Sequence, residues 1–139
     1  MKFNSYSIAI CFFTVFTTYL MYSNARGITG RTRKNGIGCT CHGQSPTSAV
    51  NVVISGPDTL RINETATYTV TISGGPAIKG GIDIACSGGV LNTVSSTLKK
   101  SGSELTQNSA IIFSNGILSF QFSYTAPSSS GTQTIYSTG

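Results

Sequence analysis

The residues that could do chemistry are concentrated in one short element of this 139-residue chain. Gly38-Cys39-Thr40-Cys41-His42-Gly43 holds two of the four cysteines and the only histidine. Covalent haem attachment uses two thiols to capture the haem vinyl groups and a following histidine as axial iron ligand, usually with the spacing C-x-x-C-H. Here the spacer is one residue shorter, which brings the thiols closer together and changes their relative direction.

Two other chemistries fit the same residue types. In an oxidising compartment Cys39 and Cys41 can close a tight disulfide, or one of them can pair with Cys86. A soft metal such as zinc or copper could instead be bound by Cys39, Cys41 and His42, with Cys86 as a further ligand. The residues alone leave the haem, disulfide and metal hypotheses open.

The first 25 residues have the pattern of a secretory signal peptide. A basic start at Lys2 precedes an apolar run from Ile8 to Tyr22 and a small-residue ending at Ala25. The run has about 15 residues, whereas a membrane-spanning helix needs about 20, so we expect cleavage after Ala25 and no membrane span in the mature chain. We therefore predict a secreted, periplasmic or cell-surface protein that has lost Cys11.

Composition narrows the function classes. The chain has 9 Lys+Arg and only 4 Asp+Glu, which leaves few candidates for paired-acid catalysis. No G-x-S-x-G motif is present and His42 belongs to the cysteine element, so we expect no enzyme. Four basic residues precede the cysteines, and outside the cytoplasm this favours a solvated or anion-facing tail over nucleic-acid binding: Arg26, Arg31, Arg33 and Lys34.

The rest of the chain must position this element, and its pattern predicts strands. From Ala49 onward apolar and polar residues alternate with a period of two. The apolar sets are Ala66-Tyr68-Val70-Ile72, Val50-Val52-Ile54, Ile82-Ile84-Cys86 and Leu118-Phe120-Phe122-Tyr124, with a last candidate over 132–136. Glycine-rich and proline-containing segments separate the strands, and Asn115-Gly116 is the strongest hairpin signal.

About seven short strands without helical periodicity predict an all-β fold. We expect an immunoglobulin-like antiparallel β-sandwich over 49–139, with a closed barrel as the alternative. Cys86 shares the apolar face of Ile82 and Ile84, so it is equally interpretable as a buried free thiol. Residues 26–48 lack alternation and are predicted to form a loop-like N-terminal extension that carries the Cys-x-Cys-His element.

Three sequence runs carry a family resemblance. NGIGCTCHGQSPTSAVNVVISGP, ETATYTVTISGGPAIKGGIDIA and SGSELTQ follow one another from Asn35 to Gln107. In this order they resemble the bacterial choice-of-anchor V type of secreted domain, a reeler-like β-sandwich found in surface proteins, in which a cytochrome-like Cys/His motif precedes the first strand. Such domains usually continue into an Asn-rich closing segment and often a sorting domain, so the resemblance implies a chain shortened at its C-terminus.

The resemblance implies roles for individual residues. Cys39 and Cys41 would hold haem c, and His42 would be the proximal iron ligand. Where such domains often have histidine after E-L-T, this chain has Gln107, which is the candidate second ligand. Met1 and Met21 both lie in the signal segment, so the sixth position would otherwise hold water or stay empty.

The predicted function is therefore an exported c-type haem-binding domain that transfers electrons with an unknown redox partner. The alternative is a non-catalytic adhesion or structural module that has no cofactor and binds a surface partner. In that alternative a disulfide forms among Cys39, Cys41 and Cys86.

Overall fold

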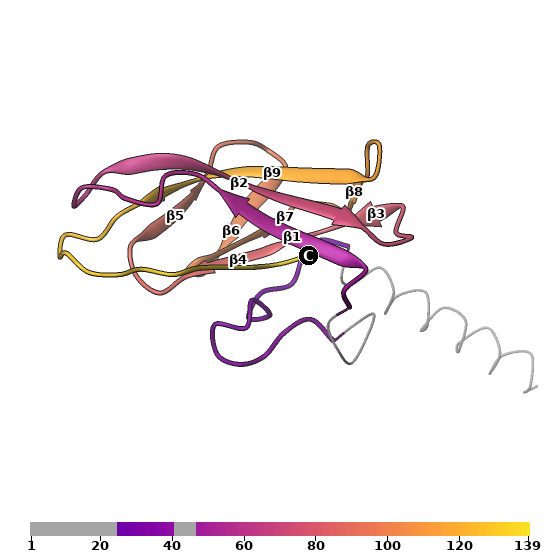
Figure 1. Ribbon diagram of the computed structural model, residues 1–139, viewed down its shortest axis with the longest axis horizontal. Coiled ribbons are helices and arrows are strands. Elements are labelled where there is room, and N and C mark those ends of the chain that lie inside the picture. The colour runs from indigo at the N-terminus through magenta and orange to yellow at the C-terminus, as the bar shows by residue number, and fades with distance from the viewer. Residues whose placement is uncertain (1–24, 41–46) are drawn as a thin grey trace, which may run out of the picture.

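The computed structural model of the protein describes residues 25–40 and 47–139 (Figure 1). Residues 1–24 of the predicted signal segment lie outside the described residues, as do Cys41 and His42. Throughout the described ranges the secondary structure is β, without a helix.

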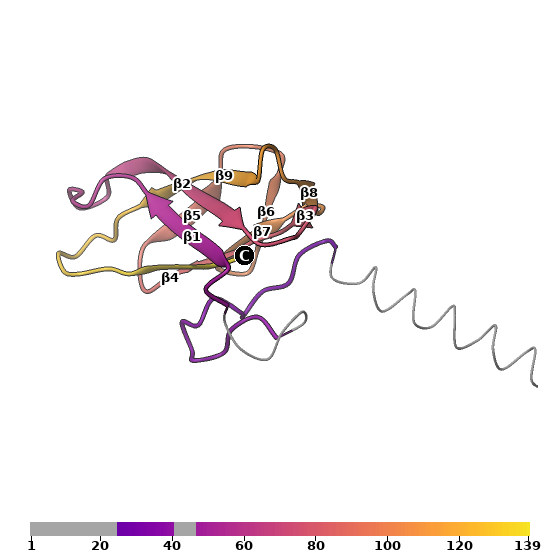
Figure 2. The same cartoon turned by 45° about the vertical axis from the view of Figure 1, so that its right-hand side comes forward.

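The protein is an antiparallel β-sandwich. One four-stranded sheet has the order β1-β2-β9-β5 and the other has the order β10-β4-β7-β6, while β3 and β8 form a small separate ribbon (Figures 1 and 2). The strands are β1 (Val50–Ser55), β2 (Thr65–Gly74), β3 (Lys79–Gly80), β4 (Asp83–Cys86), β5 (Val90–Thr93), β6 (Leu98–Ser101), β7 (Glu104–Gln107), β8 (Ile111–Ile112), β9 (Ile117–Thr125) and β10 (Ile135–Thr138). The sandwich prediction is confirmed.

The longest pairing joins β2 to β9, from Thr65 opposite Thr125 to Ser73 opposite Ile117. Because side chains alternate between the faces of a strand, the apolar residues of both strands point to one side. Tyr68, Val70 and Ile72 of β2 are buried, as the alternation predicted. β-Branched threonines occupy the outer positions of β2, where their stiff side chains suit the pleated backbone.

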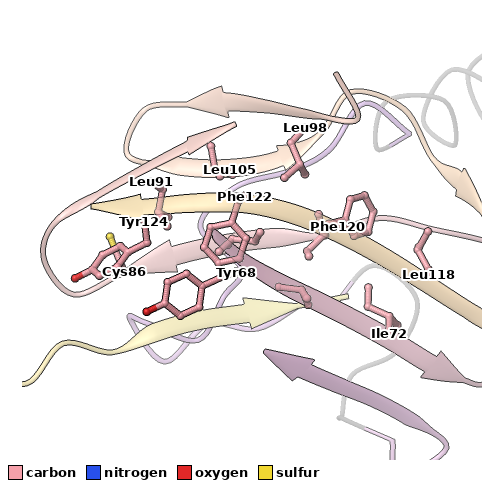
Figure 3. Packing of buried hydrophobic residues seen from close by; sticks show 13 residues of the cluster. Tyr68, Ile72, Cys86, Leu91, Leu98, Leu105, Leu118, Phe120, Phe122 and Tyr124 are labelled. Atoms are coloured by element: carbon pink, nitrogen blue, oxygen red, sulfur yellow. The ribbon is translucent and has the colours of Figure 1, made fainter. Parts of the chain in front are cut away.

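The core lies between the two sheets. Phe120 and Phe122 of β9 are its largest fully buried side chains, and Leu105 of β7 belongs to the same cluster (Figure 3). Ile84 of β4 is also part of this core. The ring of Phe122 stacks on that of Tyr68 with centroids 5.7 Å apart. Burying each such side chain contributes about 1.5–3 kcal/mol, so the packing of the sheets is the main source of stability.

The predicted turn at Asn115-Gly116 is present, but the strands on its two sides do not form a hairpin. β8 pairs with β3, β9 pairs with β2 and β5, and across the turn there is a single bridge, between Ser114 and Ile117. Asn115 and Gly116 have φ angles of 51° and 72°, the positive values that a two-residue type I′ turn requires. Ser114 and Ile117 exchange backbone hydrogen bonds of 2.9 and 3.0 Å across it. The turn leads into β9 and thereby sets which face of that strand enters the core.

The structure differs from the sequence prediction in the short strands. β5, β6 and β7 have four residues each and were not predicted, because so short a strand shows too few alternations to be recognised. The last strand begins at Ile135 instead of residue 132, and the glycine-rich segment between β2 and β4 contains the two-residue strand β3. β4 is buried on both faces instead of one, a result of how the N-terminal extension packs.

Candidate functional site

The N-terminal extension covers the outer face of the sheet β10-β4-β7-β6. Asp83, Ala85 and Thr106 point to that outer face, yet they are only 2%, 1% and 1% exposed. Gly27 lies against Thr106 so closely that an added Cβ would sit 2.2 Å from the threonine hydroxyl oxygen. Gly27 also has a φ of 84°, so both its backbone conformation and the available space require glycine.

Two carboxylates hold the extension through its backbone. The Arg31 N–H donates to Asp83 Oδ2 at 2.8 Å, and the Gly30 N–H donates to Glu104 Oε2 at 2.5 Å. Asp83 lies opposite Thr106 in the β4–β7 register, so Glu104, two residues along β7, is its diagonal neighbour on the same face. The extension is therefore fixed to the sheet by one pair of acidic side chains.

Burial under the extension changes the acidity of this pair. The pKa of Asp83 is raised from 3.8 to about 6, first because burial disfavours its charged form and further because of the neighbouring Glu104 carboxylate. The N–H of Arg31 opposes this rise because it favours the carboxylate. Asp83 Oδ1 has no hydrogen-bond partner among the described residues.

The segment from Arg31 to Cys39 forms a loop, and both of its ends contact Thr138. The Thr138 hydroxyl donates to the Arg31 carbonyl at 3.1 Å, and Cys39 Sγ lies 3.4 Å from the same oxygen. Between these contacts Arg33 and Ile37 are joined by a backbone hydrogen bond of 2.9 Å. Because its proton goes to Arg31, the Thr138 oxygen is free to accept the weak S–H donor of Cys39.

This loop brings Cys39 to the place where the edges of the two sheets meet. Thr138 belongs to β10, an edge strand of one sheet, and β1, an edge strand of the other, begins at Val50 shortly after the element. The C-terminus lies beside the start of β1 in both views (Figures 1 and 2). The exposed Cys39 thiol is thus presented at one end of the sandwich.

Cys86 is separated from this place. It lies opposite Ile135, three residues before Thr138 on β10, which is about 10 Å along a strand, whereas a disulfide needs Cα atoms within about 7 Å. Cys39 and Cys86 are both free thiols in the structure. Burial raises the pKa of the Cys86 thiol, which keeps it protonated as a small core side chain. Pairings that involve Cys41 lie outside the described residues.

Gln107 is an internal part of the fold. It is 7% exposed, and its Oε1 accepts the Ile82 N–H at 2.7 Å and the Thr106 hydroxyl at 3.1 Å. Gly81 makes room for this side chain, because a Cβ there would lie 2.1 Å from Gln107 Nε2. The Thr106 hydroxyl makes its shorter bond, 2.8 Å, to the Ile82 carbonyl, so the Ile82 N–H is the main donor to this oxygen. Because the oxygen is buried and already accepts that N–H, its surroundings disfavour Gln107 as a second iron ligand.

Sequence reasoning missed Asp83, Glu104 and Thr138. Asp83 stands between Ile82 and Ile84, so the alternation predicts that it faces solvent. The one signal of a special role is that a charged residue is rare within an apolar strand. Within 25–40 and 47–139 no three histidine, cysteine or acidic side chains are grouped to hold a metal. The same ranges hold no helix long and apolar enough to cross a bilayer.

A cleft of about 570 Å³ lies at the other end of the sandwich. It is formed by the loops after β1 and after β9, with Ile54, Tyr68 and Ile135 in its wall and the Asp58 carboxylate at its rim. The Tyr68 hydroxyl donates to the Pro57 carbonyl at 2.6 Å and fixes the first of these loops. The cleft and the cysteine element are therefore separate features.

Fold and site together define a β-sandwich that carries an anchored, thiol-bearing loop. No family model, curated protein or solved structure matches the chain. The function is therefore argued from the site itself.

Proposed function

We propose that the protein is an exported domain of the choice-of-anchor V type whose Cys-x-Cys-His element binds haem c and transfers electrons. The observation that carries the proposal is the Thr138-anchored loop, which holds Cys39 exposed and free next to Cys41 and His42 in the chain. An exposed, unpaired thiol is what thioether formation with a haem vinyl group requires. The sandwich serves as a rigid scaffold for the element.

In this proposal Cys39 and Cys41 hold the haem and His42 coordinates its iron. The haem supplies the redox chemistry, because its iron carries one electron between two oxidation states. Thr138 fixes the Cys39 end of the element, and Asp83 and Glu104 fix the segment before it. Gln107, whose oxygen is buried and accepts the Ile82 N–H, is not among the residues that would hold the haem in this proposal.

The test is absorption spectroscopy of protein exported from a host with haem maturation machinery. The proposal expects a red protein with a Soret band that persists after denaturation, because the attachment is covalent. Cys39→Ala and Cys41→Ala should lose covalent haem, and His42→Ala should alter the spectrum. Cys86→Ala is the matched control, because Cys86 is a buried thiol away from the element and its loss should leave the haem content unchanged. A colourless wild-type protein would overturn the proposal.

The second candidate is a non-catalytic surface module, and one observation favours it. The strands of the sheet β1-β2-β9-β5 present only uncharged residues on its outer face, and a charge reaches it at the β5 edge, where Lys100 Nζ donates to Asn92 Oδ1 at 3.4 Å. The outward positions hold Asn51, Val53, Ser55, Thr65, Thr67, Thr69, Thr71, Ser73, Val90, Asn92, Ile117, Ser119, Gln121, Ser123 and Thr125. Such a neutral face suits an uncharged surface partner, because a charged group would be desolvated there without compensation.

Intact mass separates this candidate from the first. A surface module with a disulfide should show a mass lowered only by lost thiol hydrogens and no haem. His42→Ala should then leave stability nearly unchanged. Haem found on the wild-type chain, with loss of haem in Cys39→Ala, would exclude this alternative.

A further inference from the structure

The extension rests on one buried carboxyl group, Asp83, and on a half-buried neighbour, Glu104. Asp83 is 2% exposed under the extension, and Glu104 accepts the neighbouring Gly30 N–H. A negative charge on Asp83 under the extension would lack solvation and would be repelled by Glu104. A proton on Asp83 removes both costs.

We propose that Asp83 and Glu104 form a proton-dependent clamp: residues 27–32 stay seated on the sheet while the pair holds one proton and lift off more readily when both carboxyls ionise. The clamp lies next to Cys39, because the Arg31 carbonyl and the Cys39 thiol contact the same Thr138 hydroxyl. The inference concerns the chain's own contacts and holds whether or not haem is attached.

Among residues 25–40 and 47–139, no basic side chain lies close enough to replace the proton on Asp83. The charged or titratable residues on the elements packed around Asp83 are Glu104 of β7, Lys99 of β6, Tyr136 of β10 and Arg31 of the extension. Of these side chains only Glu104 shifts the acidity of Asp83, and it does so in the direction of proton retention. Arg31 contributes its backbone N–H, and Lys99 lies beyond Thr106 in the same cross-strand row.

The size of the effect follows from the pKa of Asp83. The carboxyl has a pKa of about 6 under the extension against 3.8 when free, a difference of about two units. The equilibrium constant for lifting the segment should therefore rise about tenfold per pH unit between about pH 4 and pH 6. Above that window it should level off at a value about 100-fold higher than at pH 4. Openings of a segment that leave the core folded are the kind that hydrogen exchange detects.

The test is amide hydrogen exchange of Gly30 and Arg31, the two donors, followed by NMR from pH 4 to pH 7 and corrected for intrinsic rates. We expect protection of both amides to fall about 100-fold, and both to exchange faster than the core amide of Val70. Asp83→Asn keeps an acceptor for the Arg31 N–H but cannot ionise, so the protection of both amides should not change with pH. Asp58→Asn, which removes an exposed carboxyl remote from the pair, should keep the wild-type profile.

Two outcomes would overturn the clamp. One is a wild-type profile that does not change with pH, and the other is exchange of Arg31 at the same rate as Val70, which would show that the segment never lifts on its own. If Asp83→Asn does not fold, Glu104→Gln serves instead and should reduce the pH-dependent rise. The exchange measurement does not involve haem, so its failure is distinct from failure of the haem proposal.

Discussion

Replacing Gln107 by leucine separates the two roles that this residue could have. In the structure Gln107 Oε1 accepts the buried Ile82 N–H at 2.7 Å, and no other acceptor for that donor lies among the described contacts. Leucine is similar in size and fills the space under Gly81, but it cannot accept a hydrogen bond. The substitution therefore removes one interaction with little change in packing volume.

The expected cost is that of a buried backbone donor left without a partner. Such a donor costs about 1–3 kcal/mol. With a shift of about 4 °C per kcal/mol for a domain of this size, a loss of about 2 kcal/mol lowers the melting temperature by about 8 °C. Gln121→Leu is the matched control, because Gln121 is exposed on the outer face of β9, and its change should stay within about 0.5 kcal/mol.

Thermal unfolding followed by circular dichroism measures the stability, and the absorption spectrum of haem-loaded protein measures the coordination. The structural role predicts a less stable Gln107→Leu protein with an unchanged Soret band. An unchanged melting temperature together with a shifted band would refute this reasoning and restore Gln107 as an iron ligand.

Three further changes test the anchored extension. Gly27→Ala forces a Cβ onto Thr106 at a φ of 84°, so proteolysis within residues 26–40 should become several-fold faster, while wild-type rates would contradict the packing. Thr138→Val removes the hydroxyl shared by Arg31 and Cys39, so alkylation of Cys39 should accelerate up to about tenfold, for a lost hydrogen bond of about 1 kcal/mol. Because the pKa of Asp83 is raised, the native state binds more protons than the unfolded state between pH 4 and about 6. The unfolding free energy should therefore fall by about 3 kcal/mol as pH rises through that window. Urea unfolding should show this fall in the wild type and not in Asp83→Asn.

The long strands could be predicted because their signal is repeated. β2 and β9 span ten and nine residues, so the alternation that places Tyr68 and Phe122 inside is visible several times over. Asn115-Gly116 was recognisable because few residues adopt two consecutive positive φ angles. The burial of Cys86 also followed from its alternation with Ile84.

The anchoring of the extension could not be predicted because it depends on contacts between distant parts of the chain. Arg31 and Asp83 are 52 residues apart, Gly30 and Glu104 are 74 apart, and Arg31 and Thr138 are 107 apart. Apart from Asp83, a charge within an apolar strand, these residues are unremarkable in their local sequence. Only the assembled sheet shows that Asp83 is covered instead of facing solvent.

The central claim is that Cys39 and Cys41 hold a covalent haem, and the intact mass of the exported, mature protein tests it most directly. The account predicts a chain that begins at Arg26 and carries the added mass of one haem, with the addition lost in Cys39→Ala. A mature chain without that addition, whose mass is lowered only by the hydrogens of oxidised thiols, would contradict it.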